Sequence, residues 1–397
     1  MVADRVNEIG VSETMLISAE AKKLKAEGVD VINLSMGEPD FPTPHNIKEA
    51  GKLGIEENHT RYTINSGTME LRTAIQAKLK RENHLDYKLS EIIASSGAKQ
   101  SCYNAVLTTI NPGDEVIIPS PYWVSYPAMV NLAQGKVVVI DAEEKNGFRI
   151  SPEQLRKAIT PKTKMLILCN PSNPTGSAYN KKELETLAEV AEEGNFYILA
   201  DEIYEKMVYD DFKFYSFATV APKLRERIIL VNGVSKSYAM TGWRIGYTAA
   251  NEHVIEGMNK IQSHSTSHPS SVSQFAAIEA LTGPQYVINE MFIEFRKRRE
   301  FLYNELISIK GITCYKPEGA FYLFPNISAF LHKHTDILKV ETSFDFVMHL
   351  LYEAHIAVVP GNAFGAEGYL RISYATSMEN LKEAVIRLKK ALAKLIV

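Results

Sequence analysis

The chain has 397 residues, enough for two domains with substantial cores, and 44 Lys plus Arg against 47 Asp plus Glu give a formal charge of −3. This near balance supplies no attraction for nucleic acid, and no apolar run approaches the length of a membrane span. The N-terminus lacks a secretory pattern, and three cysteines (Cys102, Cys169 and Cys314) have no metal-ligand spacing. We therefore expect a cytoplasmic α/β protein without a metal, a nucleic-acid partner or a membrane partner.

The N-terminal part predicts a helix and then a short strand. The pattern of residues 13–27 indicates one helix that ends at Gly28, and residues 31–34 favour a strand. From about residue 45 to 280, short apolar runs alternate with helical patterns. The runs that predict strands cover residues 91–95, 115–119, 136–140, 164–169, 196–200 and 227–231.

This alternation predicts a mostly parallel sheet. Several runs are apolar at consecutive positions, as expected for strands that are covered on both faces. The segment 181–193 predicts a helix that ends at Gly194. Its apolar face carries Leu184, Leu187, Ala188 and Ala191. Right-handed crossovers then place a ligand site at the carboxyl ends of the strands.

The C-terminal part has a different pattern. A long charged helix over 292–307, a strand over 320–324 and an amphipathic helix from Met378 are expected there. We predict that the two termini combine into a smaller α+β domain of residues 1–45 and 289–397, beside a large domain of residues 46–288.

Two motifs at predicted strand ends suit an anionic, planar ligand. Residues 95–100 close a strand and open a helix, whose free N–H groups attract phosphate; an ordinary strand-to-helix turn is the alternative. Residues 169–176 hold Asn173 between two X-Pro units, so its amide can be fixed over a pocket or make only local turn bonds.

A third motif places a carboxylate after an apolar strand. Asp201 is costly there unless it is paired or hydrogen-bonded, and a protonated ring nitrogen would be a suitable partner; helix capping is the alternative. Tyr204, three residues later, can reach the same face of a ligand.

The fourth motif follows the strand over 227–231 and contains Lys236 and Arg244. A desolvated amine is nucleophilic and can form an imine, and a planar guanidinium suits a phosphate. An imine-forming amine beside a phosphate clamp indicates a phosphorylated aldehyde, which describes pyridoxal 5′-phosphate. A solvated Lys–Arg pair is the alternative for this motif alone.

Together the four motifs resemble the fold-type I pyridoxal-phosphate enzymes, and specifically the class I aminotransferases. The resemblance extends from residues 37–40 to 371–377, and the lysine segment with residues 241–247 is specific for that family. The chain is most similar to the bacterial and archaeal aspartate aminotransferases, which share residues 120–127 and 371–377. The implied fold is α/β, with a helix-flanked central sheet and the smaller domain from both termini.

The resemblance implies roles for individual residues. Lys236 would bind the cofactor as an imine and act as general base, with Asp201 on the pyridine nitrogen and Tyr204 and Asn173 on the ring oxygen. Trp123 would stack on the ring. The phosphate would be held by Gly97, Ala98, Lys99, Ser235 and Arg244, and by Tyr62 of the neighbouring subunit in a homodimer with shared active sites. Gly233 departs from the family, which often has serine there; Ser95, Ser96 or residues 265–267 could supply the missing contact.

The substrate is also implied by the resemblance. Arg371 would bind the α-carboxylate, with Gly37, Trp123 and Asn173 beside it, and the distal carboxylate would meet Lys99, Ser12 and Thr14. We expect amino transfer from L-aspartate to 2-oxoglutarate, which gives oxaloacetate and L-glutamate.

Several alternatives stay open at this point. They are prephenate or aromatic amino acids as substrates, a carbon–sulfur lyase or an aminocyclopropane-carboxylate synthase of the same fold, and a non-catalytic sensor domain. No basic helical module precedes residue 30, which counts against the sensor. A dinucleotide-binding dehydrogenase is excluded because no Gly-x-Gly-x-x-Gly follows a strand.

Overall fold

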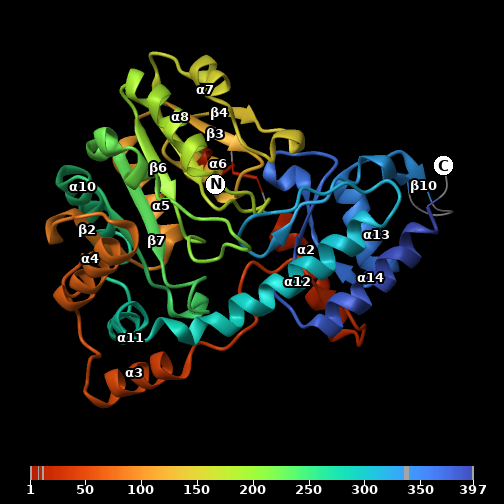
Figure 1. Ribbon diagram of the computed structural model, residues 1–397, viewed down its shortest axis with the longest axis horizontal. Coiled ribbons are helices and arrows are strands. Elements are labelled where there is room, and N and C mark those ends of the chain that lie inside the picture. The colour runs from red at the N-terminus through yellow and green to blue at the C-terminus, as the bar shows by residue number, and fades with distance from the viewer. Residues whose placement is uncertain (1, 8, 11–12, 335–338, 396–397) are drawn as a thin grey trace.

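The computed structural model describes residues 2–7, 9–10, 13–334 and 339–395. Its centre is a seven-stranded sheet with the order β2-β8-β7-β6-β5-β3-β4, on the left of Figure 1. Neighbouring strands are parallel except at β8, which is antiparallel to β2 and β7. The strands are β2 (Ile92–Ser95), β3 (Glu115–Ser120), β4 (Lys136–Asp141), β5 (Thr163–Cys169), β6 (Tyr197–Asp201), β7 (Ile228–Gly233) and β8 (Gly246–Ala249).

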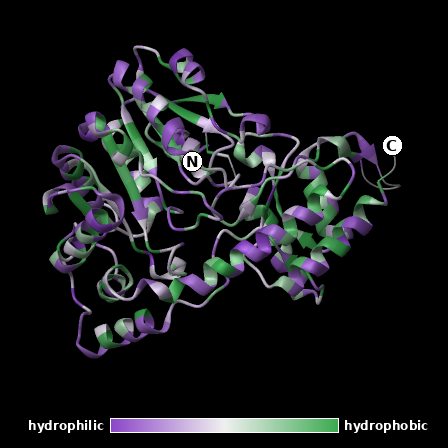
Figure 2. Ribbon diagram, in the orientation of Figure 1, coloured by the Kyte–Doolittle hydropathy of each residue, from purple (hydrophilic) through white to green (hydrophobic). Residues whose placement is uncertain are grey.

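The inner strands are buried on both faces. In β6, Ile198 and Ala200 belong to one apolar cluster and Leu199 to another, because successive side chains of a strand point to opposite faces. Truncating Leu199 to Ala should therefore cost about 2–5 kcal/mol. β4 is one of the two edge strands, and its Val139 is exposed. Figure 2 shows the apolar strands inside and polar helix surfaces outside.

Helices cover both faces of this sheet and continue into the C-terminal part (Figure 1). α8 starts with a capping box between Asn180 and Glu183. It is followed by Gly194, as predicted. The helices are α1 (Asp4–Asn7), α2 (Glu13–Ala26), α3 (His45–Glu56), α4 (Met69–Asn83), α5 (Ala98–Thr109), α6 (Ser125–Leu132), α7 (Pro152–Ala158), α8 (Lys181–Glu193), α9 (Phe217–Val220), α10 (Glu252–Ser263), α11 (Ser271–Thr282), α12 (Asn289–Ile307), α13 (Ser343–Glu353) and α14 (Met378–Leu392).

Smaller sheets occupy the right of Figure 1. In one of them an N-terminal strand pairs in parallel with a C-terminal strand, with Ile32 opposite Ile356. The expected domain limits at residues 45 and 288 stay a prediction. The sheets are β1 (Ile32–Asn33) with β12 (Ile356–Ala357), β13 (Val359–Pro360) with β14 (Leu370–Ser373) and β9 (Tyr322–Leu323), and β10 (Lys333–His334) with β11 (Lys339–Val340).

The structure differs from the predicted elements in several places. β8 was not predicted, and α12 begins at Asn289, three residues earlier than expected. The strands predicted over 31–34 and 320–324 are only two residues long, because backbone pairing with neighbours sets strand length. Among the described residues, no helix combines the length and apolarity of a membrane span. The same residues contain no cluster of His, Cys, Asp and Glu arranged to bind a metal.

Candidate active site

A cavity of about 850 Å³ lies at the carboxyl ends of β5, β6 and β7. Cys169 and Asp201 pair across the ends of β5 and β6, and Lys236 follows β7. Parallel neighbours end at the same edge, so three motifs far apart in the sequence meet here. The predicted site residues that line the cavity are Thr14, Gly37, Ala98, Lys99, Trp123, Asn173, Asp201, Tyr204, Ser235, Lys236, Arg244 and Arg371.

Two of the predicted site residues that the structure describes, Gly97 and Tyr62, are not among those that line the cavity. Gly97 lies directly before α5 with φ 87°, and a Cβ there would overlap the guanidinium of Arg244. Tyr62 is 94% exposed and its ring packs edge-on against His268. Ser12 lies outside the described residues.

Lys236 is a largely desolvated amine. Its Nζ donates to the backbone carbonyl of Gly37. Burial lowers the pKa of the Lys236 amine to about 8, and Arg371 and Arg244 act in the same direction against the opposing charge of Glu38. A substantial neutral fraction near physiological pH is what a nucleophilic amine requires.

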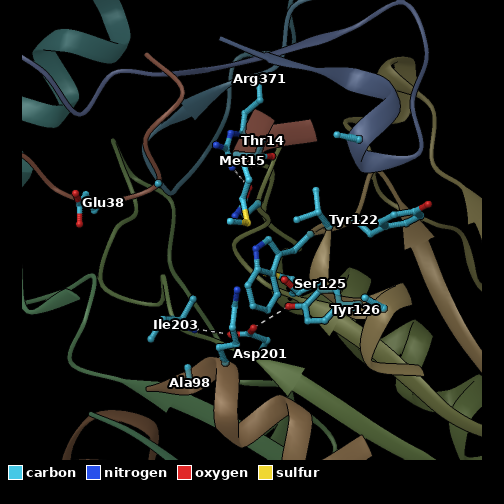
Figure 3. A pocket seen from close by; sticks show the side chains of 18 of the residues that line it. Thr14, Met15, Glu38, Ala98, Tyr122, Ser125, Tyr126, Asp201, Ile203 and Arg371 are labelled. Carbon is cyan, nitrogen blue, oxygen red and sulfur yellow. Dashed lines mark hydrogen bonds between the residues drawn. The ribbon is translucent and has the colours of Figure 1, made fainter. Parts of the chain in front are cut away.

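Asp201 is only 4% exposed and sits at the base of the cavity (Figure 3). Its Oδ2 accepts a 2.7 Å hydrogen bond from the Tyr126 hydroxyl, and its Oδ1 accepts from the Ile203 N–H at 3.2 Å. Burial raises the pKa of the Asp201 carboxyl, and the Tyr126 bond opposes that rise. Tyr126 was not among the predicted site residues, although it lies within the family-like segment 120–127.

Arg371 is a buried cation whose partners are neutral. Its Nη1 donates to Asn173 Oδ1 at 3.1 Å and its Nη2 donates to the Ser35 carbonyl at 2.6 Å. Its Nε is buried without a partner, and no ion pair to Arg371 occurs within the part of the chain that the structure describes. Burial lowers the pKa of the Arg371 guanidinium. Such a cation is complementary to an incoming carboxylate.

Tyr204 and Tyr322 form a hydrogen-bonded pair beside this arginine. Their hydroxyl oxygens are 2.9 Å apart, and the Arg371 guanidinium lies 4.7 Å from the Tyr322 ring centroid. A Cβ on Gly37 would come within 3.1 Å of the Tyr322 hydroxyl, so this wall is tightly packed. Tyr322 was not predicted; its only signal was its place in the apolar run 320–324.

The start of α5 provides an anion-binding geometry. Its first N–H groups have no intrahelical partner, and Ala98 and Lys99 line the cavity there. Arg244 donates to the carbonyls of Thr241 and Ser96, at 2.8 and 3.3 Å, which holds its guanidinium beside this helix start.

The departure at Gly233 has a steric reason. A Cβ at this position would lie 2.9 Å from the Ile245 carbonyl oxygen and 3.0 Å from the Gly246 Cα, so β8 leaves no room for a serine. The buried Ser95 hydroxyl bonds to Ser101 at 2.6 Å and to the Gly97 carbonyl at 3.1 Å, and its contact with the phosphate stays a prediction. Ser235 lines the cavity instead.

The opposite wall carries a second cation. Lys99 Nζ lies 4.9 Å from the Trp123 ring centroid, and burial followed by the charge of Arg244 lowers the pKa of the Lys99 amine. Thr14 contributes a buried hydroxyl that has no hydrogen-bond partner among the described residues (Figure 3). Glu13, which the sequence analysis did not consider, also lines the cavity.

These features fit a phosphorylated aldehyde cofactor. The cavity offers an amine of lowered pKa, a helix start with a guanidinium for phosphate, and a buried carboxylate for a ring nitrogen. The buried, unpartnered Arg371 Nε is a further donor toward a bound anion.

Comparisons with known proteins agree with this geometry. Residues 29–388 match the family model for aminotransferase class I and II. A probable aspartate/prephenate aminotransferase of Rickettsia felis is 50% identical, with 98% of this chain and 96% of the relative covered. The aspartate aminotransferase of Bacillus subtilis is 46% identical, with 99% of each covered. The crystal structure of the Rhizobium meliloti aspartate aminotransferase has a TM-score of 0.96, at 46% identity and 100% coverage of both chains.

The fold and these similarities define a fold-type I transferase. The chain belongs to the aminotransferase class I and II family and is an enzyme of the transaminase class. The predicted fold class and family are confirmed, and enzymes of this family depend on pyridoxal phosphate.

Proposed function

We propose that this enzyme transfers the amino group of L-aspartate to 2-oxoglutarate and so produces oxaloacetate and L-glutamate. The proposal depends on the buried Arg371, which lines the same cavity as Lys236. Among the described residues its partners are neutral and its Nε has none, so its guanidinium is suited to bind a carboxylate. Lys99 offers a second cation for a second carboxylate. A related Thermus thermophilus aspartate aminotransferase, 40% identical with a TM-score of 0.92, was crystallised with maleate, a dicarboxylate.

Pyridoxal 5′-phosphate is the proposed cofactor. When bound, it supplies an aldehyde for the substrate amine and a ring that withdraws electrons from the substrate Cα. Asp201 would hold the ring nitrogen, Tyr204 and Asn173 the ring oxygen, and Trp123 one ring face. The proposed phosphate ligands are Gly97, Ala98, Lys99, Ser235 and Arg244.

Arg371 would orient the substrate, and Lys236 would transfer its proton. A forked guanidinium, fixed by Asn173 and the Ser35 carbonyl, orients the α-carboxylate and thereby the Cα–H bond. The Lys236 amine then moves the Cα proton, for which its pKa of about 8 is well matched. The Tyr204–Tyr322 pair keeps the adjacent wall rigid.

Selection of a dicarboxylic substrate is assigned to Lys99 and Thr14. An ammonium and an unpartnered buried hydroxyl favour an acidic side chain over an apolar one. Ser12 was predicted to assist and lies outside the described residues.

We further propose a homodimer in the cytoplasm, with Tyr62 reaching the phosphate of the partner's site. The support is its position, since Tyr62 is 94% exposed and is not among the residues that line its own cavity. The division into residues 46–288 and the two terminal segments belongs to the same proposal.

Absorbance spectroscopy tests the proposed reaction. After loading with pyridoxal phosphate, the band of the lysine-bound cofactor should disappear with aspartate and return with 2-oxoglutarate. A spectrum that does not respond to aspartate contradicts the substrate assignment. Release of ammonia or pyruvate instead of amino transfer would identify a lyase.

Prephenate is a second candidate acceptor. The observation in its favour is that relatives of 50% identity in Rickettsia are named probable aspartate/prephenate aminotransferases. Substituting prephenate for 2-oxoglutarate in the same assay tests it directly, and failure to restore the band excludes it.

A further inference from the structure

Tyr126 lines the cavity at its base and contacts two groups of the site. It belongs to the first turn of α6, is 2% exposed, and donates its hydroxyl to Asp201 Oδ2 at 2.7 Å (Figure 3). Its ring meets Trp123 edge-on, with centroids 5.1 Å apart and an interplanar angle of 85°. One side chain therefore joins the buried carboxylate to the aromatic ring in the cavity.

The other neighbours of Asp201 leave this hydroxyl as its strongest side-chain donor. Cys102 Sγ is 3.6 Å from the same Oδ2, and thiols are weak donors. Cys169, at the end of β5, also faces the carboxylate. Lys236 is the nearby cation, yet no ion pair to Asp201 is present among the residues that the structure describes.

The Tyr126 hydroxyl keeps its proton beside the Asp201 carboxylate. Burial and the Asp201 charge raise the pKa of the Tyr126 hydroxyl far above its ordinary range. Burial likewise raises the pKa of the Cys102 thiol. Tyr126 therefore stays protonated and donates throughout the pH range of a folded enzyme, which stabilises the ionised form of its acceptor.

We propose that Tyr126 is a positioning residue that keeps the Asp201 carboxylate ionised and oriented, and also fixes the edge-on contact that orients Trp123. This role of Tyr126 rests on the proposed function, because an ionised Asp201 and an oriented Trp123 are what a protonated pyridine ring would contact. A neutral donor suits this position because it supports the negative charge of the carboxylate. A cation there would compete with the protonated ring nitrogen for the same carboxylate.

The first test is made without cofactor. Aspartate labelled with ¹³C at Cγ reports each carboxyl by NMR, and Asp201→Asn identifies the signal. We expect Asp201 to be ionised at neutral pH in the unaltered enzyme and to titrate at higher pH in Tyr126→Phe. Cys102→Ala should move the titration by less, and Tyr103→Phe, on neighbouring α5, should leave it unchanged.

A protonated Asp201 in the unaltered enzyme, or an Asp201 titration that Tyr126→Phe does not move, would overturn the proposal. The first of these outcomes is read in the unaltered enzyme and needs only the assignment variant Asp201→Asn to fold. Neither depends on cofactor binding, so a failure of the proposed function leaves this test intact.

The second test uses the loaded enzyme and separates the two contacts. Losing one charge-assisted hydrogen bond should weaken pyridoxal phosphate binding about tenfold in Tyr126→Phe, measured by equilibrium dialysis. Tyr126→Phe keeps the ring and should preserve the near-ultraviolet circular dichroism of Trp123, whereas Tyr126→Leu should change it. Unchanged affinity in Tyr126→Phe, or an unchanged Trp123 signal in Tyr126→Leu, contradicts the corresponding half of the proposal.

Discussion

Two desolvated lysine amines in this chain have opposite surroundings. Lys78, on α4, is 1% exposed and pairs with the Glu205 carboxylate. It also donates to Asn83 Oδ1 at 2.9 Å, and Asn83 Nδ2 donates to Glu205 Oε2 at 2.9 Å, which closes a three-residue cage. Lys236 has only the Gly37 carbonyl as a hydrogen-bond partner, and no carboxylate within ion-pair distance occurs in the described residues.

The difference shows that pairing, and not burial, decides what a buried amine does. A caged amine that pairs with a buried carboxylate contributes to structure. An amine that is desolvated without a carboxylate loses its proton more readily and becomes a nucleophile. The cage and the cavity are connected through adjacent residues, because Glu205 of the cage directly follows Tyr204, which lines the cavity.

The largest expected effect is the loss of the unpaired amine. Lys236→Ala should lower amino transfer at least about 10⁴-fold, since nucleophile and proton carrier are removed together. Hydride trapping followed by peptide mapping should label Lys236 in the parent enzyme and nothing in the variant. A label on another side chain would refute the assignment.

Removing the caged amine should affect stability first. Lys78→Met leaves the Glu205 carboxylate buried without a counter-charge, at a cost of about 3–5 kcal/mol in the free energy of unfolding. Urea denaturation measures this, and Lys78→Met combined with Glu205→Leu should recover most of the loss. Lys80→Met is the matched control on the same helix: its side chain is 71% exposed, so a change within about 0.5 kcal/mol is expected. Equal losses in Lys78→Met and Lys80→Met would break the comparison.

The pH dependence of cofactor uptake should report on Lys236. Only the free amine attacks an aldehyde, and the pKa is lowered to about 8, so the rate should rise as the pH passes that value and level off above it. From one unit below to one unit above, the neutral fraction rises about tenfold. Stopped-flow absorbance of cofactor-free enzyme mixed with pyridoxal phosphate measures the rise; a midpoint near that of an ordinary lysine would contradict the effect of burial.

A third lysine gives the smallest expected effect. Lys99 lines the cavity with its Nζ over the Trp123 ring, so Lys99→Met should lower kcat/KM for aspartate about tenfold and that for phenylalanine much less. Steady-state kinetics with both donors measures the ratio. Equal losses for the two would mean that Lys99 does not contact the distal carboxylate.

Much of the fold was predictable because its signals are local. The helix over 181–193 carries its cap, its apolar face and its stop within fifteen residues, and the predicted limits match α8. β8 was not predicted because its four residues are defined by antiparallel pairing with β7 and with β2, and β2 lies far away in the chain. The same pairing closes the space around Gly233.

The candidate site divides in the same way. Lys236, Asp201 and Arg371 stand in recognisable motifs, so their chemistry was expected. The bond from Arg371 to Asn173 joins residues 198 positions apart, and the bond from Tyr126 to Asp201 joins residues 75 apart. No local pattern indicates such contacts.

The sequence by itself determined the alternation of strands and helices, the family, and the types of side chain at the strand ends, because periodicity and motif chemistry act over a few residues. Only the tertiary structure decided which of those groups are paired and which are left without a counter-charge. Desolvation and ion pairing depend on what the rest of the chain places within a few ångströms, and that separates Lys78 from Lys236.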